Sequence, residues 1–255
     1  MKLSIIIPAH NEEKRIEITL RDYASFFQKK YKNNFEIIVV LNGCRDNTLD
    51  VVRKIKRKYS RIKYLSFAQS GKGFAILEGF KSASGELIGF TDADDSTTSR
   101  EFNKLIEKIG NFDGIIASRW IKGSVVQPKQ PFTRIIASRA FNMLVRILFG
   151  LNVYDTQCGA KLFRKDALKK AMLNIGIADW AFDIDLLYQL KKNNSRMLEI
   201  PITWKDSKGS KLNIAKTSLQ MLLAILRLRL IYSPFSFMIR FYDKFKIINF
   251  REMLR

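Results

Sequence analysis

Three carboxylates stand close together in the segment Thr91-Asp92-Ala93-Asp94-Asp95, directly after an apolar run. Carboxylates this close repel one another, and a hard divalent cation that they share relieves the repulsion. Oxygen ligands select Mg²⁺ or Mn²⁺, and such a metal typically joins one or two carboxylates to a diphosphate. Solvated turns and helix caps also contain this pattern, so its place at the end of a predicted buried strand decides the interpretation. We therefore predict that Asp92 and Asp94 bind a divalent metal.

Polar turns also follow the first two apolar runs of the chain. Pro8-Ala9-His10-Asn11-Glu12 comes after the first run, and Asn42-Gly43 comes after the second. The carboxyl ends of parallel strands meet at one edge of a sheet, so we expect both turns beside the aspartates. Side chains there can hydrogen-bond a nucleobase, while a glycine at 43 lets the backbone approach a ligand closely. Helix capping by Asn11 or Asp46 explains the same residues equally well.

Gly71-Lys72-Gly73 offers backbone N–H groups and a positive charge to a phosphate at the start of a predicted helix. It lacks the G-x-x-x-x-G-K-[ST] frame of a nucleoside triphosphatase loop. The sequence contains no G-x-G-x-x-G and no G-x-S-x-G, and His10 is its single histidine, which argues against hydride transfer and serine hydrolysis. Cys44 and Cys158 with one histidine cannot form a Cys/His zinc site, and so few cysteines indicate reducing, cytoplasmic conditions.

The elements that must position these residues alternate between β-branched runs and helical stretches, which predicts an α/β fold with a mostly parallel sheet. In the first half we expect strands at 3–7, 35–41, 62–67, 86–95 and 113–118, with helices at 16–31, after Asp46, from Lys72 and at 100–109. A long polar loop with Pro128 and Pro131 follows. Beyond it we expect a helix at 132–149, extended structure at 154–164, a helix at 179–192 and a strand at 196–204 that ends near Pro201.

The charge balance predicts an anionic partner. Lys and Arg number 45 against 24 Asp and Glu, a net charge of +21, which suits nucleic acid, a phosphorylated substrate or an anionic membrane. The apolar run that opens the chain is too short for a signal peptide, so we expect a protein on the cytoplasmic face of a membrane.

The composition changes near residue 213, where leucines recur at helical spacing. Arg227 and Arg229 interrupt this apolar run, which is shorter than the roughly 20 residues that a spanning helix needs. We predict a catalytic domain over 1–212 and basic amphipathic helices in the membrane interface over 213–255. Packing of these helices on the domain or on a second subunit is the alternative. The leucines that would face the membrane are Leu222, Leu223, Leu226 and Leu230.

Seven segments together resemble family-2 glycosyltransferases of the GT-A fold, over roughly residues 3–212. They are IIIPAHNEE, the Asn42 turn, Gly71-Lys72-Gly73, DADD, DTQCGAKLF (155–163), WAFDIDLL (180–187) and GSKL (209–212). The last three resemble most closely the dolichyl-phosphate β-glucosyltransferases and their archaeal and bacterial relatives.

The resemblance implies a Rossmann-like central sheet with flanking helices and an inverting, Mg²⁺- or Mn²⁺-dependent transfer. The donor would be a nucleotide sugar, with UDP-glucose favoured, and the acceptor dolichyl or another polyprenyl phosphate at a membrane surface. The implied donor site is Pro8, Ala9, Asn11, Glu12, Asn42, Lys72, Asp92 and Ala93. The implied catalytic residues are Asp94, Arg119 and Asp183, and the implied acceptor site is Arg134, Gln157, Lys161, Trp204, Ser210 and Lys211.

Three departures from the family pattern bear on these roles. Leu41-Asn42 stands where many relatives carry an Asp-Asp pair, which leaves uracil versus guanine open. Ala160 replaces a frequent aromatic residue. Ser96 stands where some mannosyl relatives place a third metal ligand, so we expect two protein ligands and water.

The acceptor decides the role of Asp183. A phosphate monoester, with a second pKa of about 6, is already a nucleophile near neutral pH, so Asp183 would orient a substrate. Transfer to a hydroxyl, as in polysaccharide synthesis, would require Asp183 as a general base. An alternative of another class is a non-catalytic membrane- or nucleic-acid-binding module, but no nucleic-acid reader motif supports it. The sequence makes no prediction of oligomeric state.

Overall fold

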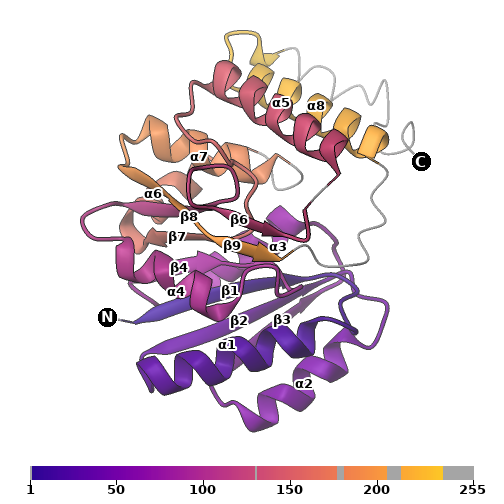
Figure 1. Cartoon of the computed structure of the whole chain (residues 1–255), viewed down its shortest axis with the longest axis vertical. Helices are drawn as coiled ribbons and strands as arrows, with labels where there is room; N and C mark the ends of the chain where they lie inside the picture. Colours follow the sequence, from indigo (N-terminus) through magenta and orange to yellow (C-terminus); the bar gives the residue numbers. More distant parts are fainter. Residues whose placement is uncertain (1, 130, 177–180, 206–213, 238–255) are drawn as a thin grey trace.

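Short apolar runs of the chain form a seven-stranded sheet that is buried on both faces (Figure 1). The computed structural model describes residues 2–129, 131–176, 181–205 and 214–237. In the order in which they lie in the sheet, the strands are β3 (Ile62–Phe67), β2 (Phe35–Asn42), β1 (Leu3–Ala9), β4 (Leu87–Phe90), β7 (Lys161–Arg164), β5 (Gly114–Ser118) and β8 (Met197–Pro201). All neighbours pair in parallel except β7, which is antiparallel to both β4 and β5.

Successive residues of each strand pack into two different cores, because side chains alternate between the faces of a sheet. In β1, Leu3, Ile5 and Ile7 lie in one cluster and Ile6 in the other. The first core is covered by α1 (Ile16–Tyr31), α2 (Thr48–Lys58) and α4 (Ser99–Lys108). The second is covered by α3 (Lys72–Ser82), α5 (Phe132–Phe149), α6 (Lys165–Met172), α7 (Phe182–Lys192) and α8 (Ile214–Ile231). The predicted α/β architecture with a mostly parallel sheet is confirmed.

A second, two-stranded sheet lies beside the main one. β6 (Val125–Gln127) pairs in parallel with β9 (Thr203–Lys205). It joins the loop that follows β5 to the segment that follows β8, and the sequence predicted neither its existence nor β6. The strand predicted over 196–204 ends near Pro201 as expected, because β8 ends at Pro201. Ile202 then separates β8 from β9, and the two strands belong to different sheets.

Two further sequence predictions need correction. Extended structure over 154–164 is wrong for its first part, where residues 154–160 form turns and only Lys161–Arg164 is a strand. Helix α6, directly after β7, was not predicted. The helix predicted over 179–192 is found from Phe182 onward, and residues 177–180 lie outside the described part of the chain.

Helices α5 and α8 lie side by side at one end of the molecule (Figure 1). Ile225 and Leu228 of α8 are buried in the second core, and Leu222 packs against it, so part of the predicted membrane-facing set is internal. Leu226 and Leu230 are 43% and 37% exposed. None of the described helices combines the length and apolar character needed to cross a bilayer. The boundary predicted at 212/213 lies outside the described residues, as does the part of the predicted membrane-interface helices from residue 238 onward. Further exposed apolar side chains of α5 are Phe132, Ile136, Met143 and Ile147.

Candidate active site

Lys72 and Asp92 form an ion pair at the carboxyl edge of the parallel strands. Lys72 Nζ lies 2.5 Å from Asp92 Oδ1, and the two side chains are 46% and 34% exposed. Lys72 is the first residue of α3, and Asp92 follows β4 by two positions. Gly71 precedes the helix with a φ of 140°, a conformation that favours glycine. Lys72, which the resemblance places in the donor site, thus contacts the predicted metal ligand Asp92.

The electrostatic environment keeps both members of this pair charged. Burial disfavours the charged form of Asp92, but the positive charges of Lys72, Lys161 and Arg119 stabilise it more strongly. The pKa of the Asp92 carboxyl therefore lies below its usual value. Burial also opposes the charge of Lys72, and Asp92 followed by Asp183 outweighs it, so the pKa of the Lys72 ammonium is raised. Side chains from several separate segments thus act on one another at this edge.

Gly159 brings the DTQCG segment directly onto Asp92. A Cβ at Gly159 would overlap the Asp92 carboxylate, and no other atom crowds that position as closely. The backbone of Gly159 lies outside the left-handed region, so glycine is required there by contact and not by conformation. The reversed direction of β7 explains the approach. Lys161 at its start pairs with Phe90 at the end of β4, which places the residues before β7 at the same edge as Asp92.

Lys161 and Asp183 form a second ion pair near the first, since Asp183 acts on the charge of Lys72 and Lys161 on that of Asp92. Lys161 Nζ lies 2.5 Å from Asp183 Oδ1 and donates to the Cys158 carbonyl at 2.8 Å. The Lys161 side chain is fully buried, and the Asp183 side chain is 12% exposed. A buried ammonium needs such partners, because an unpaired one would be strongly destabilising. Lys161, which was predicted for the acceptor site, thus contacts the predicted catalytic Asp183.

Arg119 is held by Asp155 and acts on the charge of Asp92. Arg119 Nε and Nη2 each donate to the Asp155 carboxylate at 2.8 Å, and the backbone N of Arg119 donates to it at 2.9 Å. Asp155 is fully buried, and Arg119 stacks over the rings of Trp120 and Trp204 at 5.6 and 5.4 Å. Burial disfavours the Arg119 charge, but Asp155 more than compensates and raises its pKa. The guanidinium is fixed in direction, and within the described part of the chain its Nη1 has no hydrogen-bond partner and stays a donor.

The carboxylates fit a metal that a diphosphate helps to bind. Within the described residues, no three His, Cys, Asp or Glu side chains are arranged to hold a metal alone. Asp94 Oδ1 accepts a hydrogen bond from Ser96 N at 3.0 Å. The carboxylates of Asp92 and Asp94 offer the oxygen ligands that Mg²⁺ or Mn²⁺ prefers, and the diphosphate and water would complete the set. Burial, with Asp22 and Asp94, raises the pKa of the neighbouring Asp95 to about 6.

The predicted nucleoside residues lie at the same edge. Asn42 is 2% exposed; its Nδ2 donates to the Ala9 carbonyl at 2.9 Å, and its Oδ1 accepts from Gly71 N at 3.0 Å. Asn42 therefore ties together the ends of β1 and β2 and the start of α3. Glu12 pairs with Arg15 at 2.7 Å; burial raises the pKa of Glu12 while Arg15 opposes the rise.

Other predicted donor residues have structural partners as well. Asn11 is exposed, and its Oδ1 accepts from Arg45 N at 2.8 Å. Ala93 is buried, and its carbonyl accepts from Thr19 Oγ1 at 2.8 Å. Pro8 is buried in β1. Base recognition by these residues stays a prediction.

The predicted acceptor residues are brought together only in part. Trp204 is 8% exposed and stacks with Arg119, and Lys161 is fully buried against Asp183. Gln157 is half-buried in the turn before β7, and Arg134 is half-buried in the first turn of α5. Ser210 and Lys211 lie outside the described residues.

Sequence reasoning missed Asp155 and Gly159 as individual residues, although both belong to the DTQCG segment. The spacing of that segment carried the signal, but only the fold reveals that Asp155 holds Arg119 and that Gly159 faces Asp92.

Comparison with known proteins identifies relatives of this chain. Residues 4–172 match the family described as Glycosyl transferase family 2. Dolichyl-phosphate beta-glucosyltransferase from Dictyostelium discoideum is 33% identical over 244 residues, which cover 90% of this chain and 74% of that protein. The protein of the same name from Saccharomyces cerevisiae is 32% identical over 250 residues, covering 90% and 75%.

A solved structure shares the fold at low sequence identity. Glucosyl-3-phosphoglycerate synthase from Mycobacterium tuberculosis, in complex with Mn²⁺, uridine diphosphate and phosphoglyceric acid, has a TM-score of 0.65 and 16% identity. The match covers 88% of this chain and 77% of that one. At this identity the likeness shows the fold alone.

Proposed function

Since the chain belongs to glycosyl transferase family 2, we propose that it moves a hexose from a nucleotide sugar to dolichyl phosphate or another polyprenyl phosphate. UDP-glucose is the favoured donor. The relatives that match over nine-tenths of the chain are named dolichyl-phosphate beta-glucosyltransferases, which supports both the sugar and the acceptor.

The contact between Gly159 and Asp92 carries this proposal. Asp92 is the carboxylate that pairs with Lys72, and Gly159 belongs to the DTQCG segment, whose Asp155 holds Arg119. The Lys72–Asp92 pair on the donor side and Arg119 on the acceptor side are therefore brought close together. Such an arrangement suits a reaction in which two anionic substrates meet.

The chemistry follows from bringing these two anions together. An oxygen of the acceptor phosphate forms a bond to the anomeric carbon while the bond to the diphosphate breaks, and attack from the opposite face inverts that carbon. The phosphate, with a second pKa of about 6, needs no general base near neutral pH. Lys72 neutralises charge on the leaving side, and Arg119 does so on the acceptor side. A divalent metal on Asp92 and Asp94 would further stabilise the departing diphosphate.

Asp183 fits an orienting role in this scheme. Its carboxylate is fixed by Lys161, whose ammonium is anchored on the Cys158 carbonyl. A carboxylate with one oxygen held in this way can direct the other toward hydroxyl groups of the donor sugar.

The enzyme is proposed to act from the cytoplasmic face, at the membrane surface. Leu226 and Leu230 of α8 are exposed, and Arg229 lies between them in the sequence. An exposed apolar strip flanked by cations suits the interface of an anionic leaflet.

Release of nucleoside diphosphate tests the proposal. The purified chain with UDP-glucose and Mg²⁺ or Mn²⁺ should release UDP when dolichyl phosphate is added and should form the β-anomer. The matched acceptor control is dolichol, which lacks only the phosphate. Release with dolichol would favour a hydroxyl acceptor, a retained anomer would refute the mechanism, and no release with any polyprenyl phosphate would overturn the proposal.

A further inference from the structure

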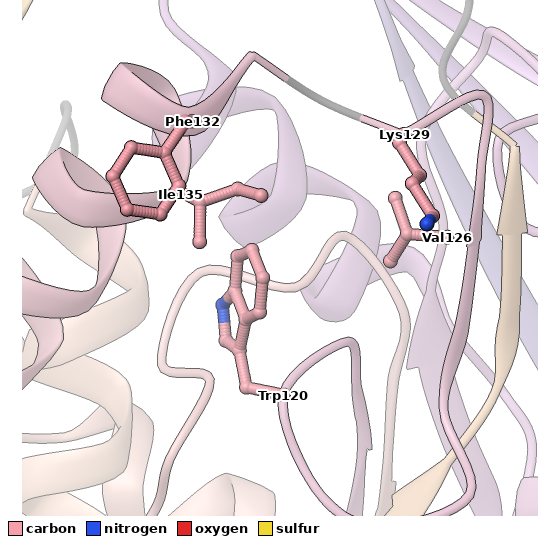
Figure 2. Close-up of a pocket in the computed structure, with 5 residues that line it drawn as sticks. All are labelled: Trp120, Val126, Lys129, Phe132 and Ile135. Carbon is pink, nitrogen blue, oxygen red and sulfur yellow. The ribbon is translucent and has the colours of Figure 1, made fainter.

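A small apolar pocket lies next to Arg119, between the loop after β5 and the start of α5. Its volume is about 270 Å³, and its lining residues are Trp120, Val126, Lys129, Phe132 and Ile135 (Figure 2). We call it the Trp120 pocket. Pockets that enclose a whole small molecule usually measure roughly 300–1,000 Å³, so this one suits one part of a larger ligand.

The pocket is apolar inside and cationic around its rim. In Figure 2, Phe132 and Ile135 lie on one side of the pocket and Val126 and Lys129 on the other, with the Trp120 ring between them. Among the described lining residues, Lys129 supplies the only charged group. A nucleotide or a sugar needs several polar partners and would find few here. A hydrocarbon that carries an anionic group at one end matches both features.

Arg139 adds a second guanidinium beside this pocket. It lies over the Trp120 ring at 5.5 Å, while Arg119 lies over the same ring at 5.6 Å. Asp155 already compensates the charge of Arg119. Within the described residues Arg139 makes no ion pair, and its side chain is exposed. Its charge is therefore available to an anion at the rim.

We propose that the Trp120 pocket binds the isoprenoid unit nearest the phosphate of the acceptor lipid, and that Arg139 is a phosphate-binding residue at its rim. This inference rests on the proposed function and adds a specific site to it. It also explains why Trp120 and Ile135, which the sequence did not single out, line a cavity beside Arg119. The lipid would reach the anomeric carbon with its first unit anchored and its phosphate directed toward Arg119.

A pair of isoleucines on α5 tests the apolar part. Ile135→Ala removes part of the pocket wall, and Ile147→Ala removes the same atoms from a 68% exposed position on the far half of the helix. The acceptor is farnesyl phosphate below its aggregation concentration, which takes membrane binding out of the measurement. We expect Ile135→Ala to raise the KM for farnesyl phosphate about fivefold to tenfold, since it removes buried apolar contact. The KM for UDP-glucose should not change, and Ile147→Ala should behave as the wild type.

A pair of arginines tests the cationic part. Arg139→Gln and Arg146→Gln are matched, because Arg146 is also on α5 and also stacks on an aromatic ring, that of Tyr154, at 4.3 Å. We expect Arg139→Gln to raise the KM for farnesyl phosphate about tenfold and to weaken its dependence on salt, because one phosphate contact is lost. Arg146→Gln should leave both unchanged.

Calorimetric binding of farnesyl phosphate without donor separates the two proposals. Weaker binding by Ile135→Ala and Arg139→Gln, but not by their controls, supports the Trp120 pocket whether or not sugar is transferred. Equal binding by a variant and its control overturns the pocket, even if the wild type is an active transferase. Absence of turnover by the wild type with every polyprenyl phosphate overturns the proposed function instead.

Discussion

Replacing Gly159 by alanine adds one methyl group at the place where the DTQCG segment meets the donor-side carboxylate. The new Cβ would overlap Asp92, so the carboxylate must turn away or the segment must move. The backbone of Gly159 is compatible with alanine, because its φ is not in the left-handed region. Any effect of the substitution therefore reports the contact and not backbone strain.

Two magnitudes follow from this geometry. Overpacking a close contact costs about 1–3 kcal/mol of the free energy of unfolding. If the carboxylate turns away instead, the pair with Lys72 is lost, and since both side chains are more than a third exposed, that loss costs only about 1 kcal/mol or less. Activity suffers more than stability, since a displacement of about 1 Å in a positioning group can lower the rate about 10²-fold.

A double-mutant cycle isolates the contact. The free energy of unfolding is measured by urea denaturation for the wild type, Gly159→Ala, Asp92→Ala and the double variant. We expect Gly159→Ala to destabilise the wild type by about 1–3 kcal/mol and the Asp92→Ala protein by much less, because the clashing carboxylate is gone. In parallel, kcat/KM for UDP release should fall about 10²-fold in folded Gly159→Ala.

Two results would refute the reasoning. The same destabilisation in both backgrounds would mean that the methyl group clashes with something other than Asp92. Wild-type activity in Gly159→Ala would mean that the position of Asp92 does not matter to turnover. The contact between Gly159 and Asp92 would then no longer support the proposed site.

Three further predictions concern the metal, pH and the membrane. Asp94→Asn should lower kcat by at least about 10²-fold without unfolding the protein, and excess chelator should stop wild-type turnover until Mg²⁺ or Mn²⁺ is restored. Glu36 is 2% exposed, and although burial opposes its charge, hydrogen bonds from Lys63, Ser4 and Ser84 lower its pKa from 4.5 to about 2. This lowered pKa contributes about 3 kcal/mol to the free energy of unfolding above pH 4.5, and the contribution is lost as the pH falls toward 2. The free energy of unfolding of Glu36→Gln, measured by urea denaturation over the same pH range, should not show this loss. Leu226→Asp together with Leu230→Asp should reduce sedimentation with anionic liposomes severalfold. This double substitution is a more specific test than truncation at 212, because the truncation would also remove the buried Ile225.

The sequence predicted most elements because their apolar patterns are long and regular. The helix over 132–149 and the helix from Lys72 begin at the predicted residues. The features that were not predicted depend on contacts between segments far apart in the chain. β6 is only three residues long and gains its ladder from β9, a partner far away in the chain, so no local pattern indicates it. The burial of Lys161 was not predicted either. A lysine in a motif gives no sign that its side chain will be fully buried against Asp183.

The reversed strand β7 explains how a single sheet edge collects the donor-side and acceptor-side groups. In a purely parallel sheet, a segment that precedes its strand enters at the amino edge, away from the ligand. Because β7 runs against β4 and β5, its first residue, Lys161, lies opposite Phe90 and Ile116 near the carboxyl ends of those strands. Asp155 and Gly159 come before Lys161 and are delivered to Arg119 and Asp92, which follow β5 and β4. If β7 ran parallel to β4 and β5, the DTQCG segment would lie at the opposite edge of the sheet, away from Asp92 and Arg119. The direction of β7 is therefore the feature that brings the separate motifs into one site.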